Sequence, residues 1–165
     1  MLIFANSFEK LDFSALMEVY AEGNEENGSY FWPEEAPTRQ MELAQDEFRS
    51  YLLGGFFGTA KGTYYIWTED GRYVSALRLE QHPEGMLMEA LETRPDYRKR
   101  GHAKQLIKAV AALLPAGTRI YSHVNKKNIP SLVTHQSCGF LKALDYSVCS
   151  DGSVCDREVT MEIIL

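Results

Sequence analysis

The sequence lacks the cysteine patterns and ligand spacings that define several classes of protein. Among its 165 residues there are three cysteines, Cys138, Cys149 and Cys155, and no Cys-x-x-Cys pair. An odd number of cysteines without paired spacing predicts free thiols in a reducing compartment rather than a disulfide framework. No metal-ligand spacing of His, Cys, Asp and Glu appears, so we expect no metal site.

Basic residues and long apolar runs are also scarce. The chain has 17 Lys and Arg against 23 Asp and Glu, a formal net charge of −6, which argues against a general nucleic-acid-binding protein. No apolar run approaches the length of a membrane span, and residues 1–13 do not resemble a signal peptide. We therefore expect one cytoplasmic domain, residues 1–165, with neither a nucleic-acid nor a membrane partner.

Two common nucleotide-binding motifs are missing as well. The sequence contains no Gly-Lys-Ser/Thr phosphate loop and no Gly-x-Gly-x-x-Gly. A nucleotide kinase or a dehydrogenase is therefore disfavoured.

The most informative stretch is residues 85–114. Residues 86–91 are apolar and interrupted only by Glu89, which predicts a buried strand. Residues 93–100 form a basic turn, and residues 101–114 carry apolar side chains at helical spacing. The stretch therefore predicts a strand, a basic turn and an amphipathic helix in that order.

This arrangement favours binding of a phosphate group at the start of the helix. The first N–H groups of a helix have no partner within it, and the helix dipole adds partial positive charge there. Gly101 and Ala103 are small enough for a phosphate to approach the backbone. Arg98, Arg100 and Lys104 add positive charge.

The spacing Arg98-x-x-Gly101-x-Ala103 resembles motif A of the GNAT family of N-acetyltransferases, Gln/Arg-x-x-Gly-x-Gly/Ala. Residues 128–140 resemble the second signature of that family, Asn-x-x-Ala-x-x-x-Tyr-x-x-x-Gly-Phe. In register with it are Asn128, Ser131, Gly139 and Phe140. His135 stands where the family usually has Tyr.

The resemblance implies an α/β (α+β) fold, with a mixed, mostly antiparallel sheet and helices on both faces. The strand at 86–91 and a strand at 118–124 should diverge and accept the acetyl-pantetheine arm of acetyl-CoA, the expected co-substrate. The implied cofactor-binding residues are Leu91, Thr93, Arg98, Lys99, Arg100, Gly101, His102, Ala103, Lys104, Asn128 and Ser131. The side chain of His102 is expected on the helix surface.

The implied activity is transfer of an acetyl group from acetyl-CoA to a primary amine of a small molecule or peptide. The alternative is a non-catalytic module that binds or senses acyl-CoA, a possibility raised by the departure at His135. The closing strands, residues 141–149 and 154–165, offer an edge of the kind that GNAT proteins often use to form a homodimer.

Acetylation of an amine requires a base, because a lysine-like amine in water has a pKa of about 10.4. Glu89 is the first candidate, since a carboxylate within an apolar strand needs a partner or a wet cleft. Its alternative role is a surface position paired with a lysine or arginine. Glu92 is the second candidate, expected on the opposite face because strand residues alternate. His123 is the third candidate base. The reading favoured over it is a buried histidine whose ring nitrogens are hydrogen-bonded within the core.

His135 is the candidate acid for the departing thiolate. As imidazolium it could supply the proton that the family's Tyr supplies, and activity should then fall as pH rises through its pKa. The alternative is that His135 only packs at the end of its helix.

The N-terminal half matches the family in layout only. We predict a strand at 1–5, a helix at 8–21, a loop at 22–38 and a helix at 38–53 ended by two glycines. Because the family places this region over the acceptor, the loop residues become candidate substrate contacts: Tyr30, Phe31, Trp32 and Glu34. The alternatives are a hydrophobic plug for the aromatic residues and plain solvent exposure for the glutamate.

Overall fold

A seven-stranded sheet forms the centre of the protein, seen here in a computed structural model that describes residues 1–59, 61–149 and 151–165. Its strand order is β1-β2-β3-β4-β5-β9-β6. The strands are β1 (Leu2–Ala5), β2 (Gly62–Glu69), β3 (Arg72–His82), β4 (Gly85–Thr93), β5 (Arg119–Asn125), β6 (Leu141–Leu144) and β9 (Glu158–Ile164). Neighbouring strands in this described sheet pair antiparallel except β4 and β5, which are parallel.

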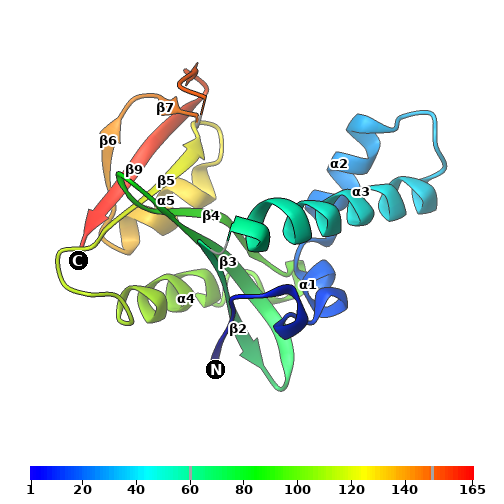
Figure 1. Ribbon diagram of the computed structural model, residues 1–165, viewed down its shortest axis with the longest axis horizontal. Helices are drawn as coiled ribbons and strands as arrows, with labels where there is room; N and C mark the ends of the chain where they lie inside the picture. Colours follow the sequence, from blue (N-terminus) through cyan, green and yellow to red (C-terminus); the bar gives the residue numbers. More distant parts are fainter. Residues whose placement is uncertain (60, 150) are drawn as a thin grey trace.

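Five α-helices accompany the sheet in the described part of the chain. They are α1 (Phe13–Val19), α2 (Ala21–Phe31), α3 (Pro37–Tyr51), α4 (His102–Ala111) and α5 (Ile129–Ser137). A short hairpin of β7 (Ser147–Val148) and β8 (Val154–Cys155) precedes β9. Figure 1 shows α4 and α1 on opposite sides of the twisted sheet. The mixed, mostly antiparallel fold with helices on both faces is therefore confirmed.

Two apolar cores result from the alternation of side chains along the strands. Ala76 of β3 faces a core with Leu16 of α1, whereas the adjacent Leu77 faces a core with Leu106 of α4. All of these leucine and alanine side chains are fully buried. A fully buried leucine side chain contributes about 1.5–3 kcal/mol through the hydrophobic effect, so both cores hold helices firmly on the sheet.

The strands from β2 to β4 form as the sequence predicts. Asp70 and Gly71 make the two-residue turn between β2 and β3, with φ of 49° and 75°. Both residues lie in the left-handed region that such a hairpin turn requires. The three strands then pair antiparallel in succession, which confirms the predicted meander.

Three predictions for the N-terminal half are wrong. The segment predicted as a loop is helical as α2, and the predicted helix at 8–21 begins only at Phe13, where Asp12 accepts a hydrogen bond from the Ala15 N–H at 3.0 Å. The two glycines do not end α3, because helical turns continue through Leu52–Phe56.

Packing against α3 explains why a segment with weak helix propensity becomes helical. A Cβ at Gly28 of α2 would lie 2.8 Å from the Gln40 backbone oxygen, so the two helices approach at the glycine. The Gln40 amide also donates to the Trp32 carbonyl at 2.9 Å and ties the connection between them. In Figure 1 the α2–α3 hairpin projects away from the sheet.

Candidate functional site

A cleft opens where the parallel strands β4 and β5 separate. The two strands pair only at Met86 with Ile120 and at Leu87 with Tyr121, and beyond these pairs they diverge. The resulting cleft has a volume of about 1240 Å³. Among the residues that line it are Glu89, Ala90, Leu91, His123, Ser131 and His135. The divergence that the resemblance implied is therefore present.

A β-bulge in β4 sits at the wall of this cleft. Glu89 pairs with Arg78 and Glu92 pairs with Ala76, so two residues of β4 lie opposite the single Leu77 of β3. Because Arg78 and Ala76 are two residues apart, they share a face of the sheet, and so do their partners. The prediction that Glu92 faces the side opposite to Glu89 is thus wrong, since the bulge adds one residue to the alternation.

Glu89, the first candidate base, is paired with an arginine. Its Oε2 accepts from Arg78 Nε at 3.2 Å and from Arg78 Nη2 at 3.0 Å. The carboxylate nevertheless lines the cleft, and its side chain is 35% exposed. Glu89 therefore combines the ion pair of the structural alternative with the access to the cleft that a base needs.

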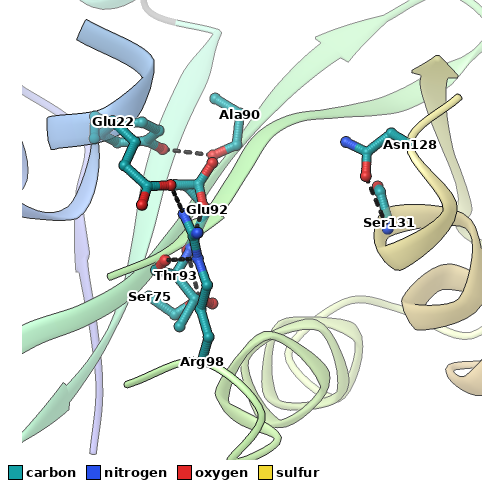
Figure 2. A network of polar contacts seen from close by, with 9 residues as sticks. Glu22, Ser75, Ala90, Glu92, Thr93, Arg98, Asn128 and Ser131 are labelled. Atoms are coloured by element: carbon teal, nitrogen blue, oxygen red, sulfur yellow. Dashed lines mark hydrogen bonds and ion pairs between the residues drawn. The ribbon is translucent and has the colours of Figure 1, made fainter. Parts of the chain in front are cut away.

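The second candidate base, Glu92, is not among the residues that line the cleft. Its Oε1 accepts from the Thr93 N–H at 3.0 Å and from Arg98 Nη2 at 3.1 Å. The same guanidinium lies 2.6 Å from Glu22 Oε2 of α2 and donates through Nε to the Thr93 carbonyl. Figure 2 shows Arg98 between these two carboxylates. Arg98 therefore fixes the turn after β4 and bridges it to α2.

The start of α4 has the geometry of an anion site. Gly101 has φ of 84°, and the first bond of the helix runs from the Gln105 N–H to the Gly101 carbonyl at 2.9 Å. The N–H groups of residues 102–104 precede that bond and have no partner in the helix. A Cβ at Gly101 would meet no atom within 4 Å, so the space beside this turn is open. Lys99, Arg100 and Lys104 are exposed beside it.

His102 does not lie on the helix surface as predicted. Its side chain is 6% exposed, and its Nε2 lies 3.4 Å from Glu69 Oε2 at the end of β2. The ring of Tyr97 packs near it, with ring centroids 6.0 Å apart. Because α4 crosses the β2–β3 hairpin, its first side chain points inward, and only the backbone of His102 remains available to a ligand.

The start of α5 brings the residues of the second signature to the cleft. Asn128 Oδ1 caps the helix by accepting from the Ser131 N–H at 3.1 Å. One turn later, His135 Nδ1 lies 2.8 Å from the Ser131 carbonyl. This contact makes Nδ1 the protonated nitrogen and leaves Nε2 as an acceptor. Nε2 is buried and has no hydrogen-bond partner among the described residues.

Burial lowers the pKa of His135, although the hydrogen bond to Ser131 opposes that effect. Burial therefore disfavours the imidazolium form, in which Nε2 would carry a proton to donate. Its ring packs edge-on against Phe140, with centroids 5.2 Å apart. These contacts favour the packing alternative over the role of acid.

The candidate substrate contacts on α2 lie away from the cleft. Tyr30 is 78% exposed and Phe31 60% exposed, so neither belongs to a hydrophobic plug. Trp32 and Glu34 follow at the connection to α3. None of the four is among the residues that line the cleft between β4 and β5. The structure therefore does not bring them to the other candidate site residues.

Sequence reasoning missed three residues beside the bulge: Tyr20, Tyr64 and Arg78. The Tyr20 hydroxyl donates to the Ala90 carbonyl, and the Tyr64 hydroxyl donates to that of Tyr20 at 3.1 Å. The two tyrosines are 44 positions apart, and no motif joins them. The sequence offered one indication of this site, because Arg78 is a charged residue within the alternating pattern of β3.

Residues 1–59, 61–149 and 151–165 contain neither a metal-binding cluster nor a membrane-spanning helix. No group of three or more His, Cys, Asp and Glu side chains converges there as a metal site. No helix in those ranges combines the length and apolar character needed to cross a bilayer. The three cysteines are free thiols, as the sequence predicts.

Comparison with known proteins identifies the class to which this fold and cleft belong. Residues 17–140 match the acetyltransferase (GNAT) family. This match spans most of the chain and includes both signatures, so the chain belongs to the GNAT family of acetyltransferases. A search of curated proteins found no similar sequence.

Solved structures show the same fold at low sequence identity. The PaiA N-acetyltransferase from Thermoplasma acidophilum, in complex with coenzyme A, is 14% identical with a TM-score of 0.64, covering 100% of this chain and 99% of its own. An acetyltransferase from Thermus thermophilus is 19% identical with a TM-score of 0.65, covering 100% and 97%. The ribosomal-protein-S18-alanine N-acetyltransferase from Escherichia coli is 17% identical with a TM-score of 0.60, covering 99% and 94%.

Proposed function

We propose that this protein transfers an acetyl group from acetyl-CoA to a primary amine of a small molecule or a peptide. The observation that carries the proposal is the cleft between the diverging strands β4 and β5, bounded by Leu91 on one strand and His123 on the other. Strands that separate leave peptide groups free to bind the amides of a pantetheine arm. The open turn before α4 offers backbone N–H groups for the pyrophosphate.

Each step of the acetyl transfer requires a specific contribution from the protein's own residues. The amine nitrogen attacks the thioester carbonyl, the C–N bond forms, and the carbonyl electrons move to oxygen. The C–S bond then breaks and the thiolate leaves. Glu89 lines the cleft and accepts the amine proton directly or through water. A backbone N–H of β4 stabilises the oxyanion.

The state of His135 supports a second candidate function. Burial lowers the pKa of His135 and so disfavours the imidazolium that would protonate a departing thiolate in place of the usual Tyr. A protein that keeps the cleft but lacks this donor could bind acyl-CoA without turnover and serve as a sensor.

Thiol release distinguishes the two functions. The protein is incubated with acetyl-CoA and a panel of primary amines and peptides, and free CoA is measured against a reaction without protein. We expect release of CoA that depends on at least one acceptor. Stabilisation by CoA without turnover on any acceptor would instead support the sensor, since saturation at 100 times Kd raises the free energy of unfolding by about 2.7 kcal/mol. Absence of both effects would refute both functions.

A further inference from the structure

The bulge in β4 places Ala90 in a backbone conformation that alanine rarely adopts. Its φ is 51°, in the left-handed region, although the residue has a Cβ. Such a conformation persists only where surrounding contacts hold it. The strained backbone therefore requires a specific contact that holds it, and a neighbouring element supplies that contact.

That contact is a hydrogen bond from Tyr20, at the junction of α1 and α2. Its hydroxyl donates to the Ala90 carbonyl at 2.5 Å, the dashed line that ends on the Ala90 oxygen in Figure 2. The Tyr20 ring is fixed by edge-on packing against Phe48 of α3 and Tyr64 of β2, with centroids 5.4 Å and 6.4 Å away. The donor is thus held by two other elements, α3 and β2.

Tyr64 fixes the direction in which the Tyr20 hydroxyl donates its hydrogen bond. Its hydroxyl donates to the Tyr20 oxygen at 3.1 Å, so the single proton of Tyr20 is left for Ala90. Burial raises the pKa of Tyr20 well above its usual value and that of Tyr64 to about 12. Both phenols therefore keep their protons at any pH at which an amine is acetylated.

The orientation of the Ala90 carbonyl also fixes the next N–H group. The C=O of Ala90 and the N–H of Leu91 belong to one planar peptide and point in opposite directions. In the described strands, the registers of β3–β4 and β4–β5 give Leu91 no partner. Both residues line the cleft. The hydrogen bond from Tyr20 to the Ala90 carbonyl thus sets the direction of the Leu91 N–H at the wall of the cleft.

We propose that Tyr20 is a positioning residue for acyl transfer, which holds the Ala90–Leu91 peptide so that the Leu91 N–H donates to the thioester oxygen. The proposal rests on the acetyltransferase function argued above. As the amine attacks, negative charge develops on that oxygen and the hydrogen bond from Leu91 strengthens. A donor fixed in advance stabilises this charge without reorganising during the reaction.

Tyr20→Phe tests the proposal, because it keeps the ring and removes only the donor. Loss of one oxyanion donor costs on the order of 10²–10³ in kcat. A donor that stays but is loosely held should cost about tenfold or more by the same argument. We expect kcat to fall by that amount while KM for acetyl-CoA changes less than about twofold. This split separates positioning from a general structural defect, which would alter both constants.

Two other tyrosines of β2 serve as graded controls. Tyr64→Phe removes the hydroxyl that supports Tyr20 and should lower kcat by less than Tyr20→Phe does. Tyr65→Phe removes a hydroxyl on the opposite face of the same strand, where Tyr65 packs against the α4 core, and should retain wild-type kinetics. Equal losses in Tyr20→Phe and Tyr65→Phe, or an unchanged kcat in Tyr20→Phe, would overturn the proposal.

A spectroscopic measurement tests the same contact without turnover. In protein labelled with ¹⁵N-leucine, the Leu91 amide proton is recorded with CoA and then with acetyl-CoA, in the absence of an acceptor. We expect acetyl-CoA to move this resonance downfield relative to CoA in the wild type, and to move it less in Tyr20→Phe. A resonance that does not distinguish the two ligands in the wild type would refute the proposal. A wild type that shows the shift but acetylates no amine would refute only the proposed function.

Discussion

The guanidinium of Arg98 turns back to Glu92, with Nη2 3.1 Å from Oε1, instead of extending toward the first turn of α4. The first residue of the proposed phosphate-binding motif therefore orders the turn through its bonds to Glu92, Glu22 and the Thr93 carbonyl. The anion site that we propose at α4 then depends on the backbone N–H groups and on the exposed Lys99, Arg100 and Lys104. It follows that backbone conformation, more than the charge of Arg98, should control affinity for CoA.

Gly101→Val tests this dependence on backbone conformation. With φ of 84°, a β-branched residue at position 101 is strained by about 1–3 kcal/mol, and the turn should shift to relieve the strain. We expect CoA to bind at least about tenfold more weakly, since tenfold corresponds to about 1.4 kcal/mol. Calorimetric titration with CoA measures the effect.

Gly117→Val is the matched control. Gly117 has φ of 83°, and a Cβ there would also meet no atom within 4 Å, but it lies in the turn after α4. It should lose a similar amount of stability and bind CoA like the wild type. Equal affinities in the two folded variants would defeat the assignment of the anion site.

Glu89→Gln tests the general base. If Glu89 accepts the amine proton, turnover at saturating acceptor should fall by about 10²–10⁴, while CoA affinity stays close to that of the wild type. Steady-state kinetics and titration with CoA give the two values. An unchanged rate would transfer the role of base to His123 or to a chain of water molecules.

Glu162→Gln provides a control for the ion pair. Glu162 pairs with Arg119 at 2.7 Å, and its side chain is 32% exposed, similar to the 35% of Glu89, but it does not line the cleft. Both variants should show comparable small changes in melting temperature. Only Glu89→Gln should lose turnover.

His135 should make the stability of the protein depend on pH in the acidic range. Burial lowers its pKa below the value of 6.5 expected in the unfolded chain, so the unfolded state binds the proton more readily. The contribution of the neutral ring is complete above that value, and stability is lost as pH falls below it. Urea unfolding between about pH 5 and pH 8 should show this loss in the wild type, and His135→Phe should reduce it. Parallel pH dependence in both proteins would contradict the assignment.

Leu106→Ala tests the core that holds α4 against the sheet. Leu106 is fully buried, so the substitution leaves a cavity and should lower the free energy of unfolding by about 2–5 kcal/mol. Leu113→Ala, just beyond the helix at a position that is 58% exposed, should change it by no more than about 0.5 kcal/mol. Denaturant unfolding of both variants checks the difference.

Much of the sheet and its central helix could be predicted from local sequence. The strands β2 and β3, the turn at Asp70-Gly71 and the helix α4 each combine a regular apolar period with clear turn residues. Helix α2 could not be predicted, because its own residues favour a loop and it is stabilised by packing against α3 at Gly28. The predicted face of Glu92 was wrong because the bulge inserts one residue into β4, which reverses the alternation of side chains beyond it.

The sequence by itself determined the family, a strand–turn–helix of the kind that can bind an anion, and the position where His135 replaces a tyrosine. These are local properties, set by spacing and by backbone N–H groups at a helix end. Only the tertiary structure decided which nitrogen of His135 carries the proton, that Arg98 pairs with Glu92, and that Tyr20 bonds to Ala90 across 70 positions. Those contacts depend on how separate elements pack, and side-chain periodicity along the chain carries no record of which distant residues will meet.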